Sequence, residues 1–286
     1  MSIFFIFGLT DFFMFLILLI FQIRLIFANL YPILKMISNF IKDTLMENNT
    51  YYNTNAATSV NEGLRQYMLK VYNFMTAGLS LTALSAYLII NTPLLRLFFT
   101  TNQAGQFGLS GFGWLMFLAP LIMVFAFSWV INRGSAAQAQ LFFWTFSAVM
   151  GISLAPTLLI YTGSSIVRVF LITAGTFGAM SLYGYTTKRD LTGMGSFLIM
   201  GLWGIIIATI VNIFLKSTGL DYALSFLGLF IFIGLTAFDT QRIRNMYDGF
   251  GGAEIATKKA IVGALSLYLD FINMFLYLMR FMGDRR

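Results

Sequence analysis

Long apolar runs separated by short polar segments dominate the chain from residue 67 onward. Each run has about 20 residues or more, the length that a helix needs to cross the hydrocarbon layer of a bilayer. Seven such runs are expected, at residues 69–92, 112–132, 140–161, 166–186, 194–216, 223–246 and 258–282. Because the apolar character is continuous and does not alternate, the pattern predicts membrane-spanning helices and not the strands of a barrel.

The last run carries a stripe of polar and small residues within the sequence GALSLYLDFINMFLYLMRFMG. Steps of three and four residues place the members of this stripe on one helix face. They are Gly263, Ser266, Asp270, Asn273 and Tyr277. An acid at this depth costs roughly 2.5–3.5 kcal/mol on insertion scales, so it needs a partner, a proton or a water-filled cavity. We therefore expect the last helix inside a bundle, with its stripe facing a polar cavity.

The first 66 residues differ from the rest and form two segments. Residues 1–45 include an apolar run at 3–34 that lacks the positive start and cleavage site of a signal peptide. This run is either an extra spanning helix or a stretch that is not made because translation begins at Met46. Residues 46–66 are polar and rich in Asn and Thr, which predicts a flexible tail. Residues 67–286 then form one seven-helix membrane domain.

The composition supports a membrane protein and excludes several kinds of site. Charged residues make up 10% of the chain and the mean hydropathy is +0.80, whereas soluble domains carry about 25% charged residues. The absence of Cys and His excludes thiol chemistry, Ser-His catalysis and the usual zinc sites. Any pH sensing must then come from carboxylates, and any metal held by side chains must be a hard ion with oxygen ligands. The net charge of +7 is spread between the apolar runs, so nucleic-acid binding is not expected.

The distribution of Lys and Arg predicts the orientation of the chain in the membrane. The side of the membrane that holds the start of the seven-helix domain carries eleven of these residues, and the opposite side carries six, with Arg24 of the N-terminal segment left out. The positive-inside rule places the richer side in the cytoplasm. The C-terminus is therefore expected on the outer side.

Two acids lie within the predicted helices of the membrane domain, Asp239 in the sixth and Asp270 in the seventh. A short loop joins these helices, so they are expected to be antiparallel neighbours with both acids in the inner half of the membrane. Arg133, at the inner end of the second helix, reaches the same level. Two carboxylates held close in low dielectric share a proton and titrate in two steps, and they also offer oxygen ligands to Ca²⁺. The structural alternative is a solvated Asp239 and an Asp270 that pairs with Arg280 or Arg133.

The motif TAFDTQRI, followed by the striped last run, closely resembles the signature end of the Bax inhibitor-1 family. The resemblance covers about residues 67–283, including the TTKRDL turn after the fourth helix. It implies an all-α integral membrane fold in which six helices surround a central C-terminal helix. One departure is Phe238, where Tyr commonly precedes the first acid in this family.

For bacterial members, the resemblance implies a pH-sensitive calcium leak across the inner membrane. The acids of the family's paired-aspartate sensor match Asp239 and Asp270, which are also the candidate Ca²⁺ ligands. The arginine that latches the gate matches Arg133. Membrane lipids and calcium ions are the partners that this function implies, and no bound cofactor is expected.

Two other functions remain as alternatives. Some family members resemble inhibitors of a membrane-bound AAA protease that act through a flexible N-terminal tail, a character shared by residues 46–66. An intramembrane aspartyl protease also uses two acids on adjacent helices, but its second acid follows Gly-x-Gly, whereas Asp270 follows Leu-Tyr-Leu. We therefore expect a membrane transport or regulatory protein and not an enzyme.

Overall fold

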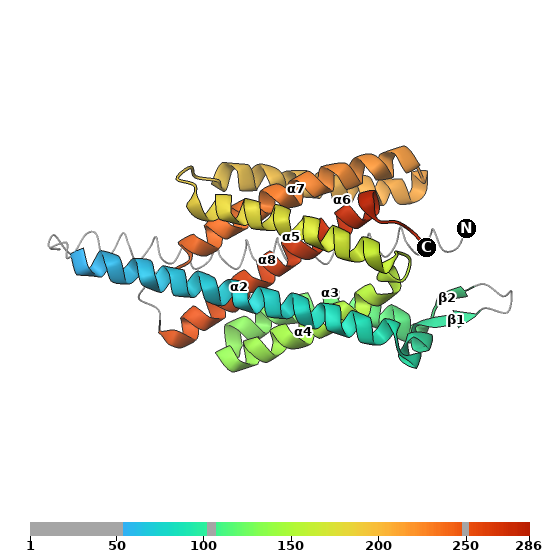
Figure 1. Ribbon diagram of the computed structural model, residues 1–286, viewed down its shortest axis with the longest axis horizontal. Helices are drawn as coiled ribbons and strands as arrows, with labels where there is room; N and C mark the ends of the chain where they lie inside the picture. Colours follow the sequence, from blue (N-terminus) through green and yellow to red (C-terminus); the bar gives the residue numbers. More distant parts are fainter. Residues whose placement is uncertain (1–53, 102–106, 248–251) are drawn as a thin grey trace.

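The computed structural model of the protein describes residues 54–101, 107–247 and 252–286 (Figure 1). Its long helices are α2 (Thr54–Ile90), α3 (Gly111–Arg133), α4 (Ala136–Leu158), α5 (Gly163–Thr186), α6 (Thr192–Leu215), α7 (Thr218–Asn245) and α8 (Ala253–Met282). Within these ranges, all seven are long and apolar enough to span a membrane. The predicted all-α membrane domain is confirmed, and continuous apolar runs are the reason that each segment is helical.

The N-terminal predictions lie largely beyond the described part of the chain. Residues 1–45, with their candidate extra helix, are outside it, and so are residues 46–53. The flexible tail predicted at 46–66 needs a correction, because α2 already begins at Thr54. The Glu62 carboxylate accepts hydrogen bonds from Arg65 and Gln66 within this helix, at 3.4 and 3.3 Å. Such spacings favour helix even in a polar sequence.

Helix α8 is the core of the bundle. In its most apolar stretch, 89% of the residues are buried, far more than in any other described helix. Figure 1 shows α8 crossing obliquely between α2 and α4 on one side and α5 and α7 on the other. Helices α3 and α6 pack mainly against α4 and α7. The central C-terminal helix is thus confirmed, with four helices directly around it and two in an outer position.

Close approach of the helices depends on glycines at a few crossings. A side chain at Gly184 of α5 would collide with the backbone carbonyl of Ala237 on α7. Gly151 of α4 lies equally close to the carbonyl of Thr82 on α2. Small residues are typical of such crossings, because helices in lipid associate through close packing and not through a hydrophobic driving force.

A short hairpin at one end of the bundle is absent from the prediction. After α2, the chain forms a 3₁₀ helix, η1 (Pro93–Phe98), and two antiparallel strands, β1 (Phe99–Thr101) and β2 (Phe107–Leu109). The Ser110 hydroxyl then caps α3 by accepting a hydrogen bond from the Gly113 amide at 3.0 Å. These elements are too short to leave a periodic signal in the sequence.

Candidate functional site

The polar stripe of α8 lies along α7 and not on an outer face. At its inner end, a side chain at Gly263 would lie 2.9 Å from Ile243 of α7. At its outer end, the Tyr277 ring packs over Gly228, where a side chain would collide with it. The same ring stacks on Phe232, with 5.9 Å between the centroids. We call the buried contact around Asp239, Ser266 and Asp270 the α7–α8 seam.

Asp239 occupies the inner part of this seam and is fully buried. Its Oδ2 accepts a hydrogen bond of 2.8 Å from the Ser266 hydroxyl of α8. Its Oδ1 lies 3.2 Å from Nη2 of Arg242, one turn further along α7. The same Nη2 donates to the Ser266 hydroxyl at 2.9 Å, which closes a triangle of three side chains. The alternative of a solvated Asp239 is therefore wrong.

Asp270, the second predicted acid, is also fully buried. It lies four residues after Ser266 on α8, so it shares the helix face that holds Asp239. Asn273 and Tyr277 continue this face outward, and both are buried. The structure therefore brings both acids to one seam, and the remaining stripe residues extend it toward the outer end of α8.

Arg133 lies away from this arrangement. Its side chain is exposed at the end of α3, a helix that packs mainly on α4. In the described part of the chain, no ion pair joins Arg133 to Asp239 or Asp270. Its role as a latch remains a prediction from the resemblance.

Arg242 is the residue of this site that sequence reasoning missed. Its guanidinium carbon lies 5.6 Å from the centroid of the Phe238 ring, within the range of a cation–π contact. The ring is fixed in turn against α6, because a side chain at Gly195 would have no room beside it. The spacing of three residues from Asp239 on one helix is the signal that could have identified this pair.

The TAFDTQRI motif also faces the loop between α5 and α6. The side-chain amide of Gln241 donates to the Arg189 carbonyl at 2.7 Å, and its oxygen accepts from the Leu191 amide at 2.8 Å. Arg244 donates to the Tyr185 carbonyl near the end of α5. The loop is the TTKRDL turn, so the two sequence motifs of the resemblance touch each other. One turn of α7 thus holds α8 on one side and this loop on the other.

The acid of that loop is not suited to sensing pH near neutrality. Hydrogen bonds from the hydroxyl and the backbone N–H of Thr192 hold the pKa of Asp190 below its ordinary value. Its carboxylate is therefore ionised at neutral pH and gains a proton only in acid. Asp190 is therefore set aside as a sensor, and the buried acids of the seam remain the pair that the sequence singled out.

The opposite side of α8 holds a neutral polar contact. The Tyr268 hydroxyl lies 2.7 Å from the hydroxyl of Thr82 on α2, and both residues are buried. Thr82 also bonds to the carbonyl of Ser147 on α4 at 2.9 Å. Edge-on contacts with Phe143 and Phe146 enclose the Tyr268 ring. This cluster of hydroxyls joins α2, α4 and α8 without any charge.

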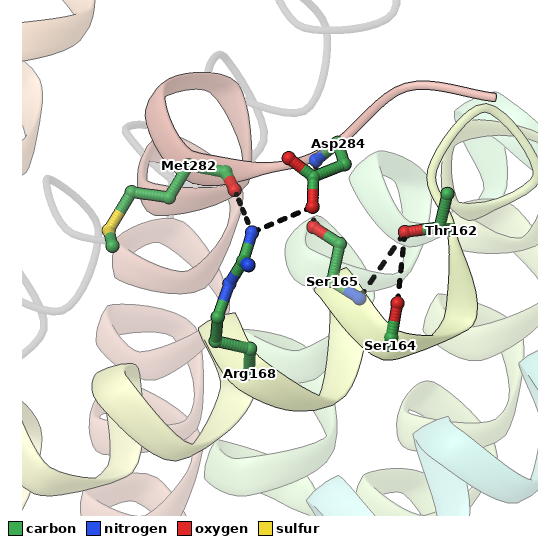
Figure 2. Close-up of polar contacts among 6 residues, drawn as sticks. All are labelled: Thr162, Ser164, Ser165, Arg168, Met282 and Asp284. Atoms are coloured by element: carbon green, nitrogen blue, oxygen red, sulfur yellow. Dashed lines mark hydrogen bonds and ion pairs between the residues drawn. The ribbon is translucent and has the colours of Figure 1, made fainter.

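The outer end of α8 is held by polar contacts to α5, in which Arg168 and Asp284 are exposed and Ser165 is buried (Figure 2). Nη2 of Arg168 donates to the Met282 carbonyl and to the Asp284 carboxylate, both at 2.9 Å. The backbone amide of Asp284 donates to the Ser165 hydroxyl at 2.8 Å. We call Arg168, Ser165 and Asp284 the outer clasp.

A second ion pair at this end ties α8 to α7. Arg280, named in the structural alternative as a partner for Asp270, lies 3.6 Å from the carboxylate of Asp221. It also donates to the Ser225 hydroxyl at 2.9 Å. These contacts and the outer clasp fix the outer end of α8 to both of its neighbours.

Comparisons with known proteins agree with this architecture. The family model described as inhibitor of apoptosis-promoting Bax1 matches residues 64–286. The protein RP147 of Rickettsia prowazekii is 49% identical over 241 residues, covering 82% of this chain and 98% of its own. The inner membrane protein YbhL of Escherichia coli K12 is 44% identical over 226 residues, covering 78% and 94%. The chain therefore belongs to the Bax inhibitor-1 family and is a multi-pass protein of the bacterial inner membrane.

Proposed function

We propose that this protein forms a proton-sensitive leak pathway for Ca²⁺, with Asp239 and Asp270 as its sensor. The observation that carries the proposal is the buried triangle of Asp239, Arg242 and Ser266, with Asp270 one turn away. Apolar residues of similar volume are often as stable as a buried ion pair, so stability alone gives little reason to keep one in this position. Ionisable residues within membrane spans mark ion or proton pathways by default.

The expected response to pH follows from the charges of the seam. While Asp239 is ionised, Arg242 of the same helix compensates its charge, and both side chains bond to the Ser266 hydroxyl of α8, which holds α7 against α8. Asp270 brings a second carboxylate to the same seam, so the charge of the seam changes when either acid gains a proton. When Asp239 is protonated, the ion pair is lost and the seam is free to separate. The leak should therefore increase as the pH falls.

The oxygen ligands of the seam are suited to weak, transient binding of a cation and not to tight binding. Ca²⁺ takes about six to eight oxygen ligands when it is held tightly. Among the described residues, no group of three or more acids could hold a metal ion. The two carboxylates and the Ser266 hydroxyl supply only part of a full shell. A weak site of this kind is what conduction requires, because a bound ion must also leave.

The proposal implies that the described conformation is closed. Between Asp270 and the outer end, Tyr277 fills the seam by packing over Gly228 and against Phe232. A cation can pass only if α7 and α8 move apart along this line. Movement at the inner end is then the step that a proton controls.

The test is Ca²⁺ entry into liposomes that contain the full chain, measured between about pH 6 and pH 8. Asp239→Asn and Asp270→Asn should each flatten the pH dependence, because the shared proton is lost. Asp221→Asn is the matched control, since this acid lies at the outer end of α7 and is largely exposed. If both seam variants keep the wild-type curve, the sensor assignment is wrong.

The same experiment separates the leak from the second candidate function. In that function, the protein inhibits a membrane-bound AAA protease through its N-terminal segment. Folded protein that carries no Ca²⁺ at any pH would exclude the leak. Stabilisation of protease substrates on deletion of residues 1–53 would then support the regulator.

A further inference from the structure

We infer that Arg242, and not Arg133, is the cation that latches the α7–α8 seam shut. The effect of the latch on ion flux rests on the proposed leak function. The latch itself concerns only whether α7 and α8 stay in contact. It assigns a positioning role to a residue outside the paired acids and the arginine suggested by the resemblance.

The position of the Arg242 guanidinium is built by three elements of the fold. On α7, Asp239 faces its Nη2 at 3.2 Å. On α8, the Ser266 hydroxyl accepts from the same nitrogen at 2.9 Å. Below the guanidinium lies the ring of Phe238, which is fixed against Gly195 of α6. The cation therefore bridges α7 and α8 directly, which a latch must do.

The guanidinium of Arg242 uses only some of its hydrogen-bond donors. Its Nε and Nη1 are buried and have no hydrogen-bond partner among the described residues. Its side chain retains 17% of its exposure, so the guanidinium is not completely enclosed. If Asp239 gains a proton, the remaining strong contact of Arg242 is a neutral hydroxyl. A buried cation without its counterion is strongly unfavourable, and a long Arg side chain can extend to the interface.

Few other ionisable groups face the pair from the surrounding helices. Helix α6 contains none between Thr192 and Leu215. The other helices packed against α7 carry ionisable groups that include Asp270 and Lys259 on α8, Tyr185 on α5 and Tyr72 on α2. Lys259 donates to the Met246 carbonyl at 3.2 Å, beyond the end of α7. The Tyr72 hydroxyl is 2.7 Å from that of Ser181.

Arg133 has none of these contacts. It is exposed on a helix that packs mainly on α4, and no ion pair joins it to either acid in the described part of the chain. In this closed conformation it therefore does not compensate the charge of Asp239. Arg133 provides a matched control, because it is also an arginine at the inner end of a spanning helix.

The absence of Cys makes a labelling experiment direct. Ile243 is fully buried beside Gly263, next to Arg242, so Ile243→Cys places a single thiol in the seam. The rate of maleimide labelling at one fixed pH, relative to the unfolded chain, reports opening of the seam without any ion. Arg242→Gln and Arg133→Gln are compared in this background in the full chain.

Loss of the latch should raise the labelling rate in Arg242→Gln by about tenfold or more, since removal of one partner of a buried pair is strongly unfavourable. Arg133→Gln should stay within about twofold of the parent, as exposed charges contribute little. Arg242→Lys keeps the charge but not the planar fork, so it should fall between the two. Arg242→Lys also replaces Arg242→Gln as the test variant if the glutamine variant does not fold.

Each outcome of this experiment decides the question. An unchanged rate in the Arg242 variants overturns the inference, and an increase confined to Arg133→Gln assigns the latch to Arg133. Ca²⁺ entry in the same proteins is a separate readout. If labelling responds to Arg242 but the wild type carries no Ca²⁺ at any pH, the latch stands and the leak function fails.

Discussion

The two sides of α8 are both polar and buried, yet they hold the bundle by different means. Toward α7, Ser266 takes part in a triangle with charged Asp239 and Arg242. Toward α2 and α4, Tyr268 meets the hydroxyl of Thr82. Hydroxyl groups keep their protons across the physiological pH range, whereas a carboxylate and its counterion respond to a proton.

The comparison suggests that one side of α8 is a scaffold and the other a switch. On the scaffold side, Gly151 lets α4 pack closely against the Thr82 carbonyl of α2, and the Thr82 hydroxyl bonds to that of Tyr268. On the switch side, Asp239 and Arg242 of α7 pair with each other and both bond to Ser266 of α8, and we propose that a proton on Asp239 breaks this arrangement. Helix α8 can then stay fixed to α2 and α4 while α7 moves.

The largest expected effect is on the charged side. Asp239→Leu leaves Arg242 buried without its counterion and should destabilise the protein by about 3–5 kcal/mol. The double variant Asp239→Leu/Arg242→Leu removes both charges and should recover most of that loss. Thermal unfolding in detergent micelles compares the two. If the double variant is as unstable as the single one, the loss does not come from an uncompensated charge.

A backbone crossing on the scaffold side should give the next largest effect. In Gly151→Ala, the new methyl group meets the Thr82 carbonyl and Ser85, which should cost about 1–3 kcal/mol. The pH dependence of Ca²⁺ entry should not change, because no charge is touched. Gly175→Ala is the control, since no atom lies within 4 Å of the added group. Equal destabilisation by both substitutions would contradict the assigned crossing.

Removal of the hydroxyl of Tyr268 tests the neutral contact with a smaller change. Tyr268→Phe keeps the ring between Phe143 and Phe146 but loses the bond to Thr82. A loss of about 1 kcal/mol is expected for one hydrogen bond. The midpoint of the pH curve for Ca²⁺ entry should stay where it is. A shift of that midpoint would mean that the two sides of α8 are coupled.

The outer clasp should give the smallest effect. Arg168 and Asp284 keep 52% and 63% of their side-chain exposure, so solvent screens the pair. Arg168→Ala should cost no more than about 1 kcal/mol, and less at high salt. A double-mutant cycle with Asp284→Ala at two salt concentrations measures this coupling. A large coupling that is insensitive to salt would show that the clasp is a main support of α8.

Much of this architecture follows from local patterns in the sequence. Continuous apolar runs define the seven spans, and spacing of three and four residues on the last one predicts both its central place and the inward position of Asp270. Local patterns do not predict which four helices contact α8 directly, because packing between distant segments decides which helices are neighbours. Residues 54–66 are too polar to indicate that α2 extends through them.

The missed site residues show where such patterns stop. Arg242 lies near the end of a predicted span, where a positive charge is read as an orientation signal. Whether its side chain turns inward depends on Phe238, Gly195 and Ser266, which lie on three different helices. Tyr268 likewise looks like one aromatic residue in an apolar run until Thr82 of α2 is placed beside it.

The central claim is that a proton on the α7–α8 seam controls a Ca²⁺ leak. It is tested most directly by the ratio of Ca²⁺ entry at about pH 6 to that at about pH 8. The wild type and the double variant Asp239→Leu/Arg242→Leu are compared in the same liposomes. We expect a ratio well above one for the wild type and close to one for the folded double variant. A wild-type ratio of one, or an unchanged ratio in the double variant, would contradict the account.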